Sequence, residues 1–160
     1  MKSILLLIVM FSFSLFVSAQ EKKEEPPTLG PGAKAPDFNL KGVDGEMHSL
    51  SDYDDADVLA VLFTCNHCPT AQAYEQRVID LVDDYEDNSF QLIGISSNAP
   101  DAISLSELGY SDLSDTYEEM QIRAEEMDYN FPYLYDGDEQ AAALAYGPVA
   151  TPHIFIFDED

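Results

Sequence analysis

The chain has two cysteines, Cys65 and Cys68, which are separated by two residues, the second of them His67. A helical pattern starts at Pro69, which predicts that the first thiol lies at a helix N-terminus, where unpaired N–H groups and the helix dipole favour an anion. A Cys-x-x-Cys pair in such a place has a lowered thiol pKa, and the imidazolium form of His67 would stabilise the Cys65 thiolate further. We therefore interpret the pair as a redox-active dithiol, whose stabilised reduced form makes its disulfide oxidising.

A structural disulfide and a zinc site are the two other interpretations of this cysteine pair. A four-residue loop gains little from closure, because stabilising disulfides usually span longer loops. A zinc site would need more ligands, and the three histidines, His48, His67 and His153, do not have zinc-finger spacing.

The segments around the cysteines predict a parallel crossover. Val58–Phe63 is continuously apolar, as in a central strand covered on both faces. Pro69–Tyr85 has helical periodicity, with Tyr74 on the apolar face and Glu75 among the polar positions. Phe90–Ser96 is a second buried strand. A strand, helix and strand in this order form a right-handed unit. The cysteines are therefore expected at the carboxyl end of a parallel strand, where open α/β sheets place their sites.

The remaining segments complete an α/β pattern. Alternating side chains with a Gly-Val-Asp-Gly turn predict a short hairpin over Ala35–Leu50. The later elements are expected to be a helix, a short strand, an alanine-rich helix and an apolar strand, at Leu113–Met127, Phe131–Tyr135, Glu139–Tyr146 and His153–Phe157.

The first residues differ from the rest of the chain. Lys2, an apolar run and the small residues Val17-Ser18-Ala19 predict a secretory signal peptide over residues 1–19, with an uncleaved membrane anchor as the alternative. Residues 20–34, rich in Glu, Lys, Pro and Gly, are predicted to be a linker, and residues 35–160 one domain. The mature chain is then expected to be exported into a periplasm, where a disulfide persists, and not to span the membrane.

The net charge of −24 excludes one class of partner. Such a negative field repels nucleic acid and anionic lipid, so we expect no nucleic-acid partner. Charge runs usually cover solvated faces, although recognition of a basic protein is an alternative.

Three short segments resemble the thioredoxin superfamily, in its periplasmic thiol-disulfide oxidoreductase and redoxin (peroxiredoxin-like, AhpC/TSA-type) branches. They are Ala35-Pro36-Asp37-Phe38, Cys65-x-x-Cys68-Pro69 and Thr151-Pro152 before an apolar strand. The resemblance implies a thioredoxin-like α/β fold, with an N-terminal hairpin and a central mixed sheet covered by helices on both faces. The family's last strand and C-terminal helix do not appear before Asp160, so we expect either that the chain is a fragment or that the sheet lacks its edge and the cover for Phe155 or Phe157. The family proline that matches Pro152 is cis and packs beside the disulfide.

The sequence also departs from family patterns. Thr64 stands where thioredoxins usually have tryptophan. Leu59 replaces a buried acid that some thioredoxins keep, which leaves His67 or water to handle protons. Cys68 also matches the peroxidatic position of peroxiredoxins, but their late-strand arginine is replaced by Thr151-Pro152.

The sequence thus predicts a thiol-disulfide oxidoreductase without a cofactor, acting on protein thiols or disulfides and recycled by a redox partner protein. Cys65 is expected to be the exposed nucleophile and Cys68 the resolving thiol, supported by His67, Pro69, Thr151 and Pro152. One alternative is a thiol peroxidase with antioxidant activity. The other is Cu(I) binding by the two thiols with His67 or His153.

Overall fold

The computed structural model describes residues 27–85, 89–99 and 113–158. The predicted signal peptide and the first part of the predicted linker lie outside these residues. The elements in chain order are β1 (Asn39–Gly42), β2 (Met47–Ser49), η1 (Leu50–Tyr53), β3 (Val58–Thr64), α1 (Pro69–Tyr85), β4 (Phe90–Ser96), α2 (Tyr117–Glu126), β5 (Tyr133–Tyr135), α3 (Ala141–Tyr146) and β6 (His153–Asp158).

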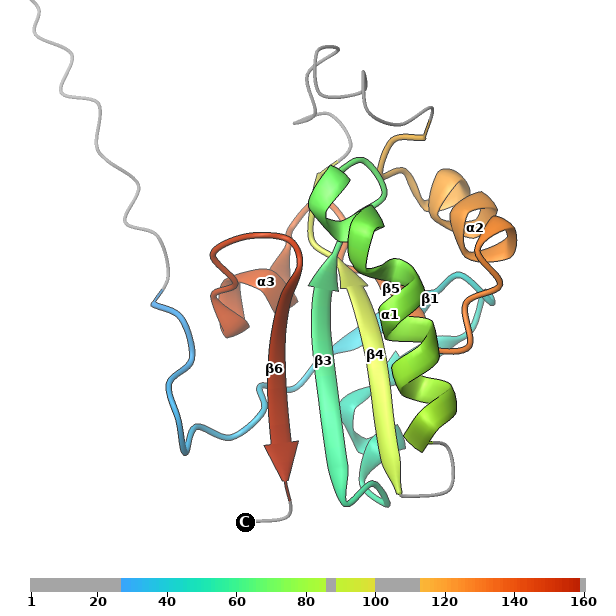
Figure 1. The fold of residues 1–160 in the computed structure, drawn as a ribbon. Helices are drawn as coiled ribbons and strands as arrows, with labels where there is room; N and C mark the ends of the chain where they lie inside the picture. Colours follow the sequence, from blue (N-terminus) through green and yellow to red (C-terminus); the bar gives the residue numbers. More distant parts are fainter. Residues whose placement is uncertain (1–26, 86–88, 100–112, 159–160) are drawn as a thin grey trace, which may run out of the picture.

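The six strands form one mixed sheet in the order β2-β1-β5-β4-β3-β6 (Figure 1). β4 pairs in parallel with both β3 and β5, whereas β6 runs antiparallel to β3. β1 pairs antiparallel with β2 and with β5, so the predicted N-terminal hairpin is the other edge of the sheet. These pairings and the surrounding helices confirm the predicted thioredoxin-like α/β fold.

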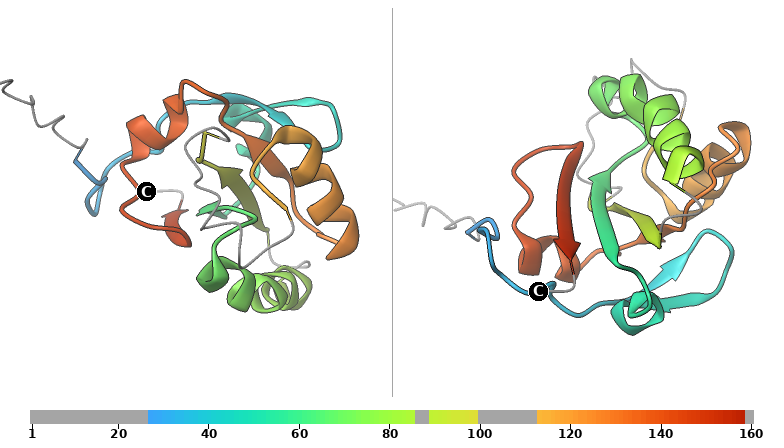
Figure 2. Two further views of the ribbon diagram at one scale, coloured as in Figure 1. Left: turned by 90° about the horizontal axis from the view of Figure 1, so that it is seen from above. Right: turned by 60° about the horizontal axis from the view of Figure 1, so that its bottom comes forward.

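Strand β3 is buried on both faces because its side chains alternate between two apolar clusters. Ala60 and Leu62 belong to the cluster under α1, which also contains Ile79, Leu92 and Phe131. Val61 and Phe63 belong to the cluster on the opposite face, which α3 and the N-terminal segments cover (Figure 2). Every residue of β3 after Val58 is therefore buried, and its last residue, Thr64, directly precedes Cys65.

Helix α1 has the predicted bounds, and Val78, Leu81 and Val82 pack against the core as predicted, but single positions of its buried face differ. Tyr74 was expected to point inward, yet it is 46% exposed. The buried positions are Ala71, Glu75 and Ile79, which lie four residues apart along one stripe. The Glu75 carboxylate is tolerated there because it pairs with the Arg123 guanidinium of α2 and accepts a hydrogen bond of 2.7 Å from the Tyr129 hydroxyl.

Helix α2 begins at Tyr117 and not at the predicted Leu113. Thr116 is its N-cap, because its Oγ1 accepts a hydrogen bond of 3.2 Å from the Glu119 N–H. The Glu119 carboxylate accepts in turn from the backbone N–H of Ser114 at 3.1 Å. This capping arrangement leaves Asp115 outside the helix, free to point back toward the end of β3.

The last strand is covered differently from the expectation. Phe155 is only 9% exposed, because its ring packs on Phe63 and Tyr146. The side chains left open on β6 are Ile154 and Ile156, which are 44% and 67% exposed. The prediction that Phe155 or Phe157 would be uncovered was therefore wrong, since the α3 face supplies the cover. Within the described residues no element follows β6.

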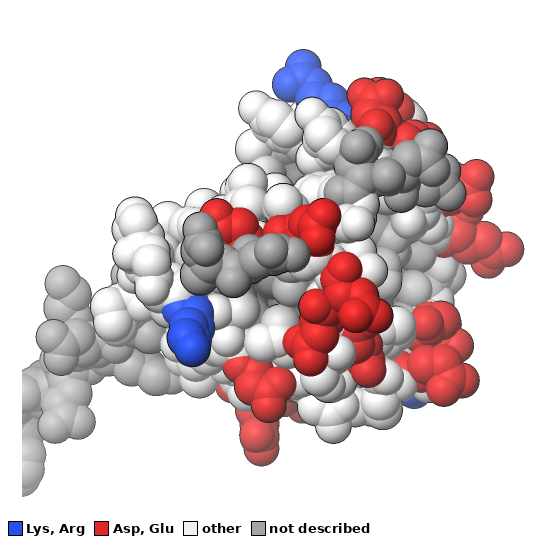
Figure 3. Space-filling view, turned by 90° about the horizontal axis from the view of Figure 1, so that it is seen from below, with Lys and Arg blue, Asp and Glu red and all other residues white. Residues whose placement is uncertain are grey.

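The described helices are too short or too polar to cross a membrane. The surface is strongly acidic, and Figure 3 shows carboxylates distributed over the face seen from below, with few cations among them. Charged runs of this kind usually cover solvated faces.

The buried pair of Glu75 and Arg123 provides a stability test. Replacing Glu75 with Ala should lower the free energy of unfolding by about 3 kcal/mol, because it leaves the Arg123 charge without its partner. Urea unfolding measures the loss. Asp84, exposed on the same helix, is the matched control, and Asp84→Ala should change stability by less than about 0.5 kcal/mol. Equal stabilities of the two variants would contradict the importance of the α1–α2 contact.

Candidate active site

The cysteine loop lies at the carboxyl end of β3, as predicted, and leads directly into α1 (Figure 1). Cys65 follows the last residue of β3, Cys68 precedes the helix, and Pro69 is the first helical residue. The peptide bond between Thr151 and Pro152 is cis, in agreement with the family resemblance. This bond lies just before β6, whose first residue, His153, pairs with Phe63 near the end of β3. The cysteine loop and the cis bond therefore meet at one end of the sheet.

Thr151 contacts both sulfur atoms. Its Oγ1 lies 3.2 Å from the Cys65 Sγ, and its carbonyl oxygen accepts a hydrogen bond of 3.3 Å from the Cys68 thiol. Both cysteines are free thiols in this structure. The structure therefore brings together Cys65, Cys68, Thr151 and the adjoining Pro152, which were predicted from distant parts of the sequence.

Cys68 is the more acidic thiol. Partial burial opposes its ionisation, but hydrogen bonds from the backbone N–H groups of Ala71 and Thr70 outweigh that burial and lower the pKa of Cys68. The Thr70 side chain also contributes. These amides are the unpaired donors of the first turn of α1, so the helix N-terminus stabilises an anion at this sulfur.

Cys65 has the opposite properties. Its side chain is 2% exposed, and burial raises the pKa of the thiol to about 12, with a further rise from the Asp115 carboxylate. The prediction that Cys65 is the exposed, readily ionised thiol was therefore wrong. The reason is where the helix starts: α1 begins at Pro69, so its free N–H groups point at Cys68, and Cys65 is still at the end of a buried strand.

A buried carboxylate, Asp115, organises the loop between the cysteines. Its Oδ1 accepts a hydrogen bond of 2.7 Å from the Asn66 N–H and one of 3.4 Å from the His67 N–H. Its Oδ2 lies 2.8 Å from the His67 Nδ1 and accepts a hydrogen bond of 2.8 Å from the Asn98 side-chain amide. The imidazole that was expected to act on Cys65 alone is thus paired with an acid.

The side chain of Asn66 fixes the loop from the other side. Its amide nitrogen donates to the Ser114 carbonyl at 2.7 Å, and its oxygen accepts from the Tyr133 hydroxyl at 3.2 Å. The Gln72 amide donates to the Asn66 carbonyl at 2.7 Å. Nearly every polar group of the loop is therefore held by a named partner, which keeps the two sulfurs in place.

Sequence reasoning missed Asp115 and Asn66. Ser114, Thr116 and Glu119 form a recognisable helix-start pattern, which could have placed Asp115 just outside α2. Nothing in the sequence indicates that this residue meets His67, 48 positions earlier.

The site offers one group of metal-ligand type within the described residues. Single ligand atoms of Cys65, His67 and Asp115 lie within 4.8 Å of one another. Both Asp115 oxygens, however, already accept N–H donors, which disfavours a cation there. The other histidine of the copper hypothesis, His153, stacks on Phe155 and accepts a hydrogen bond of 3.2 Å from the Val149 N–H.

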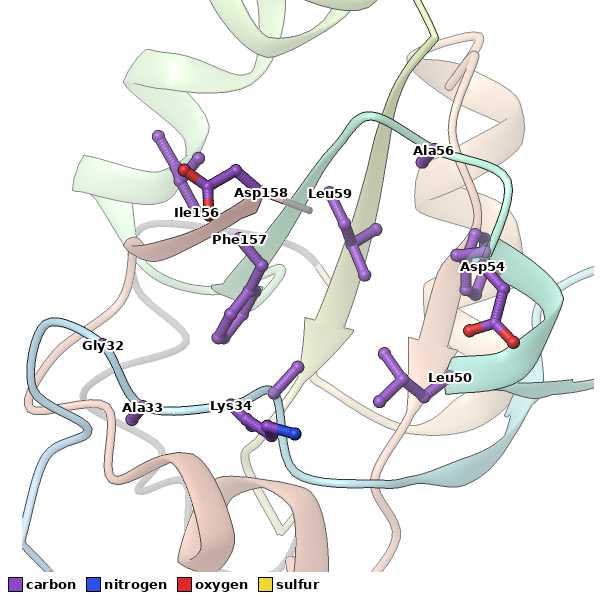
Figure 4. A pocket seen from close by; sticks show the side chains of 12 residues that line it. Gly32, Ala33, Lys34, Leu50, Asp54, Ala56, Leu59, Ile156, Phe157 and Asp158 are labelled. Atoms are coloured by element: carbon purple, nitrogen blue, oxygen red, sulfur yellow. The ribbon is translucent and has the colours of Figure 1, made fainter. Parts of the chain in front are cut away.

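A pocket of about 620 Å³ lies at the opposite end of β3 from the cysteines (Figure 4). The N-terminal segment, η1, Leu59 and the end of β6 line it. It contains no cysteine, so we do not assign the predicted chemistry to it.

Comparison with known proteins gives a family match that covers most of the chain. The model of the AhpC/TSA family matches residues 31–160. A hypothetical protein from Sinorhizobium meliloti 1021 has a similar structure, with a TM-score of 0.72 and 29% sequence identity over 82% of this chain and 67% of that one. An uncharacterized conserved protein from Geobacillus kaustophilus has a TM-score of 0.70 and 35% identity. That match covers 81% of this chain but only 64% of the Geobacillus protein.

The fold extends to more distant proteins. The thioredoxin domain of a thiol-disulfide oxidoreductase from Bacteroides vulgatus has a TM-score of 0.65 and 19% identity, over 82% of this chain and 83% of that one. No curated protein matches the chain.

The different environments of the two thiols predict different alkylation rates. In the reduced protein at pH 7, iodoacetamide should modify Cys68 faster than Cys65, because the lowered pKa of Cys68 gives it more thiolate. In Cys68→Ser, alkylation of Cys65 should be slow and should rise about tenfold per pH unit through the alkaline range, since a raised pKa keeps the thiol protonated until about pH 12.

Peptide mapping of the labelled protein measures both rates. In concentrated urea the two cysteines should react alike, which provides the control. Faster labelling of Cys65 in the folded protein would show that the assignment of the two thiols is reversed.

Proposed function

Because the chain belongs to the AhpC/TSA family, we propose that it is a thiol-disulfide oxidoreductase that exchanges disulfides with protein substrates through Cys65 and Cys68. One observation carries this proposal: an acidic, partly exposed thiol and a buried, protonated thiol meet at the same residue, Thr151. An attacking sulfur and a protected resolving sulfur are what two-step exchange requires.

In the reducing direction, the Cys68 thiolate attacks one sulfur of a substrate disulfide. The substrate S–S bond breaks, a mixed disulfide with Cys68 forms, and the first substrate sulfur leaves as a thiolate. Cys65 then attacks the Cys68 sulfur, the mixed disulfide breaks, and the second substrate sulfur leaves. The substrate gains two electrons and the protein becomes a disulfide. A redox partner protein returns it to the dithiol, and the reverse sequence oxidises a substrate.

The substrate is expected to lie along the segment before β6. Val149 is 76% exposed and Ala150 is exposed, so the backbone next to Thr151 is open to an extended chain. Pairing of a substrate strand there would bring its disulfide to Cys68, whose thiol already contacts the Thr151 carbonyl. The negative net charge supports a protein partner and not a nucleic acid.

We place this chemistry outside the cytoplasm, in the periplasm, because residues 1–19 have the pattern of a secretory signal peptide. An oxidising compartment also allows the disulfide form to accumulate. N-terminal sequencing of the protein from fractionated cells tests this assignment: a mature chain that starts near Gln20 supports it, and an intact Met1 in the cytosolic fraction contradicts it.

Peroxide reduction is the second candidate, and one observation favours it. Cys68, the acidic thiol, holds the position that the sequence matched to the peroxidatic cysteine. The donors that lower its pKa most are backbone N–H groups and hydroxyls, however, and Thr151-Pro152 stands where peroxiredoxins have arginine. With Thr151-Pro152 in place of that arginine, we expect consumption of peroxide to be slower than disulfide exchange under equal conditions.

Trapping of mixed disulfides tests the proposed function. Cys65→Ser should accumulate a covalent complex with a disulfide-bonded protein substrate, because the resolving thiol is gone. Cys68→Ser should form no complex and lose exchange by at least about a hundredfold, since the remaining thiol is buried and protonated. Non-reducing electrophoresis and mass spectrometry identify the sulfur that is bound. Trapping on Cys65 in the Cys68→Ser variant would reverse the roles.

A further inference from the structure

The second half of the proposed exchange poses a proton problem. Cys65 must lose its proton when it attacks the mixed disulfide, yet its side chain is 2% exposed and has no contact with bulk water that could take the proton at once. We propose that His67 and Asp115 are the proton-transfer pair for Cys65. His67 is the base, and Asp115 is the residue that positions the imidazole. This inference rests on the proposed function and names two further residues for the same site.

The three groups lie together. One ring nitrogen of His67 and one carboxylate oxygen of Asp115 are within 4.8 Å of each other and of the Cys65 sulfur. That separation is close enough for a small side-chain rotation or one bridging water to complete a proton path. Asp115 cannot drift away, because the Asn66 N–H at 2.7 Å and the Asn98 amide at 2.8 Å hold its two oxygens.

The hydrogen bond between His67 and Asp115 determines which ring nitrogen is the base. An ionised carboxylate only accepts, so the 2.8 Å contact with Oδ2 places the hydrogen on Nδ1. Nε2 is then the free acceptor, and the carboxylate stabilises the imidazolium that forms when Nε2 takes a proton. The His67 side chain is 17% exposed and that of Asp115 is 0% exposed, so His67 is the member that can pass the proton on to solvent.

The Asp115 carboxylate affects Cys65 and His67 in opposite ways. It disfavours the Cys65 thiolate, which keeps this thiol protonated while the protein waits for substrate. Its Oδ2 also lies 2.8 Å from the His67 Nδ1, so a carboxylate stands beside the ring that receives the proton when the Cys68 sulfur is in a disulfide and can be attacked. The other titratable groups that face Cys65 are Cys68 on the same loop and the buried Tyr133 hydroxyl of β5.

In this step the Cys65 S–H bond breaks and its proton passes through one bridging water to the His67 ring, while a bond forms between the Cys65 and Cys68 sulfurs. The bond between Cys68 and the substrate sulfur breaks, and its electron pair leaves with the substrate as a thiolate, which takes a proton from His67 or from water. Two protein thiols are oxidised and one substrate disulfide is reduced.

A neutral aromatic disulfide, dipyridyl disulfide, separates the two halves of the reaction. Attack by Cys68 releases one coloured thiopyridone at a rate proportional to reagent concentration. Attack by Cys65 on the mixed disulfide releases the second at a rate independent of that concentration. His67→Gln should slow the second phase by about a hundredfold at neutral pH, the usual contribution of a positioned base, and leave the first phase within about twofold.

Asp115→Asn should also slow the second phase, with a different pH profile. In the unaltered protein the rate of the second phase should depend less steeply on pH than in His67→Gln. In His67→Gln it should keep rising with pH, because only ionisation of Cys65 by hydroxide remains. In Asp115→Asn that rise should begin at lower pH, since the charge that disfavours the Cys65 thiolate is gone. Added imidazole should restore the second phase of His67→Ala, which a purely structural role would not explain.

Asp136→Asn is the matched control for loss of a buried carboxylate. Asp136 is 6% exposed and accepts hydrogen bonds from the Ala142 and Ala143 N–H groups at the start of α3, so both phases should be unchanged.

If Asp115→Asn does not fold, His67→Gln and the imidazole rescue of His67→Ala test the proton-transfer pair without it. A normal first phase with an unaltered second phase in His67→Gln would overturn the proton-transfer pair alone. Absence of the first phase in the unaltered protein would overturn the proposed exchange itself.

Discussion

The site depends on the buried carboxylate of Asp115. A carboxylate without solvent contact is stable only when its oxygens are hydrogen-bonded, and here the donors are two backbone N–H groups of the cysteine loop, the His67 ring and the Asn98 amide. The same contacts therefore satisfy the charge and fix the loop. Removing the carboxylate would leave the loop amides without acceptors, so the geometry of the sulfurs and the placement of Asp115 cannot be separated.

This constraint explains why two cysteines three positions apart in number differ so much chemically. The loop holds Cys68 against the open amides of α1 and holds Cys65 at the end of a strand buried on both faces. Thr151 closes the arrangement by contacting both sulfurs from the segment before β6. Cys68 is thus prepared to attack, and Cys65 stays protonated until the second step. The groups that lower the pKa of Cys68 are uncharged N–H and hydroxyl donors.

The rest of the fold carries Asp115 to this position. The pair of Glu75 and Arg123 ties α2 to α1, and the capping of α2 by Thr116 turns the chain so that Asp115 faces the loop. The strong surface acidity is explained by solvation of the charged side chains. The residues that set the chemistry are therefore few, and most of them come from the segments just before α1 and α2.

The sequence by itself determined the fold class, the strand that ends at the cysteines, the bounds of α1 and the cis-proline segment, because continuous apolar runs, helical periodicity and short motifs are local signals. It placed Glu75 outward, assigned the exposed role to Cys65 and gave no sign of Asp115 or of the Asn66 contacts. Each of these depends on which groups meet across the fold: a buried acid is stable only beside its partner, and the acidity of a thiol depends on the register between one cysteine and the first turn of a helix. Only the tertiary structure decided them, since burial and hydrogen bonding between segments almost 50 residues apart leave no local pattern in the chain.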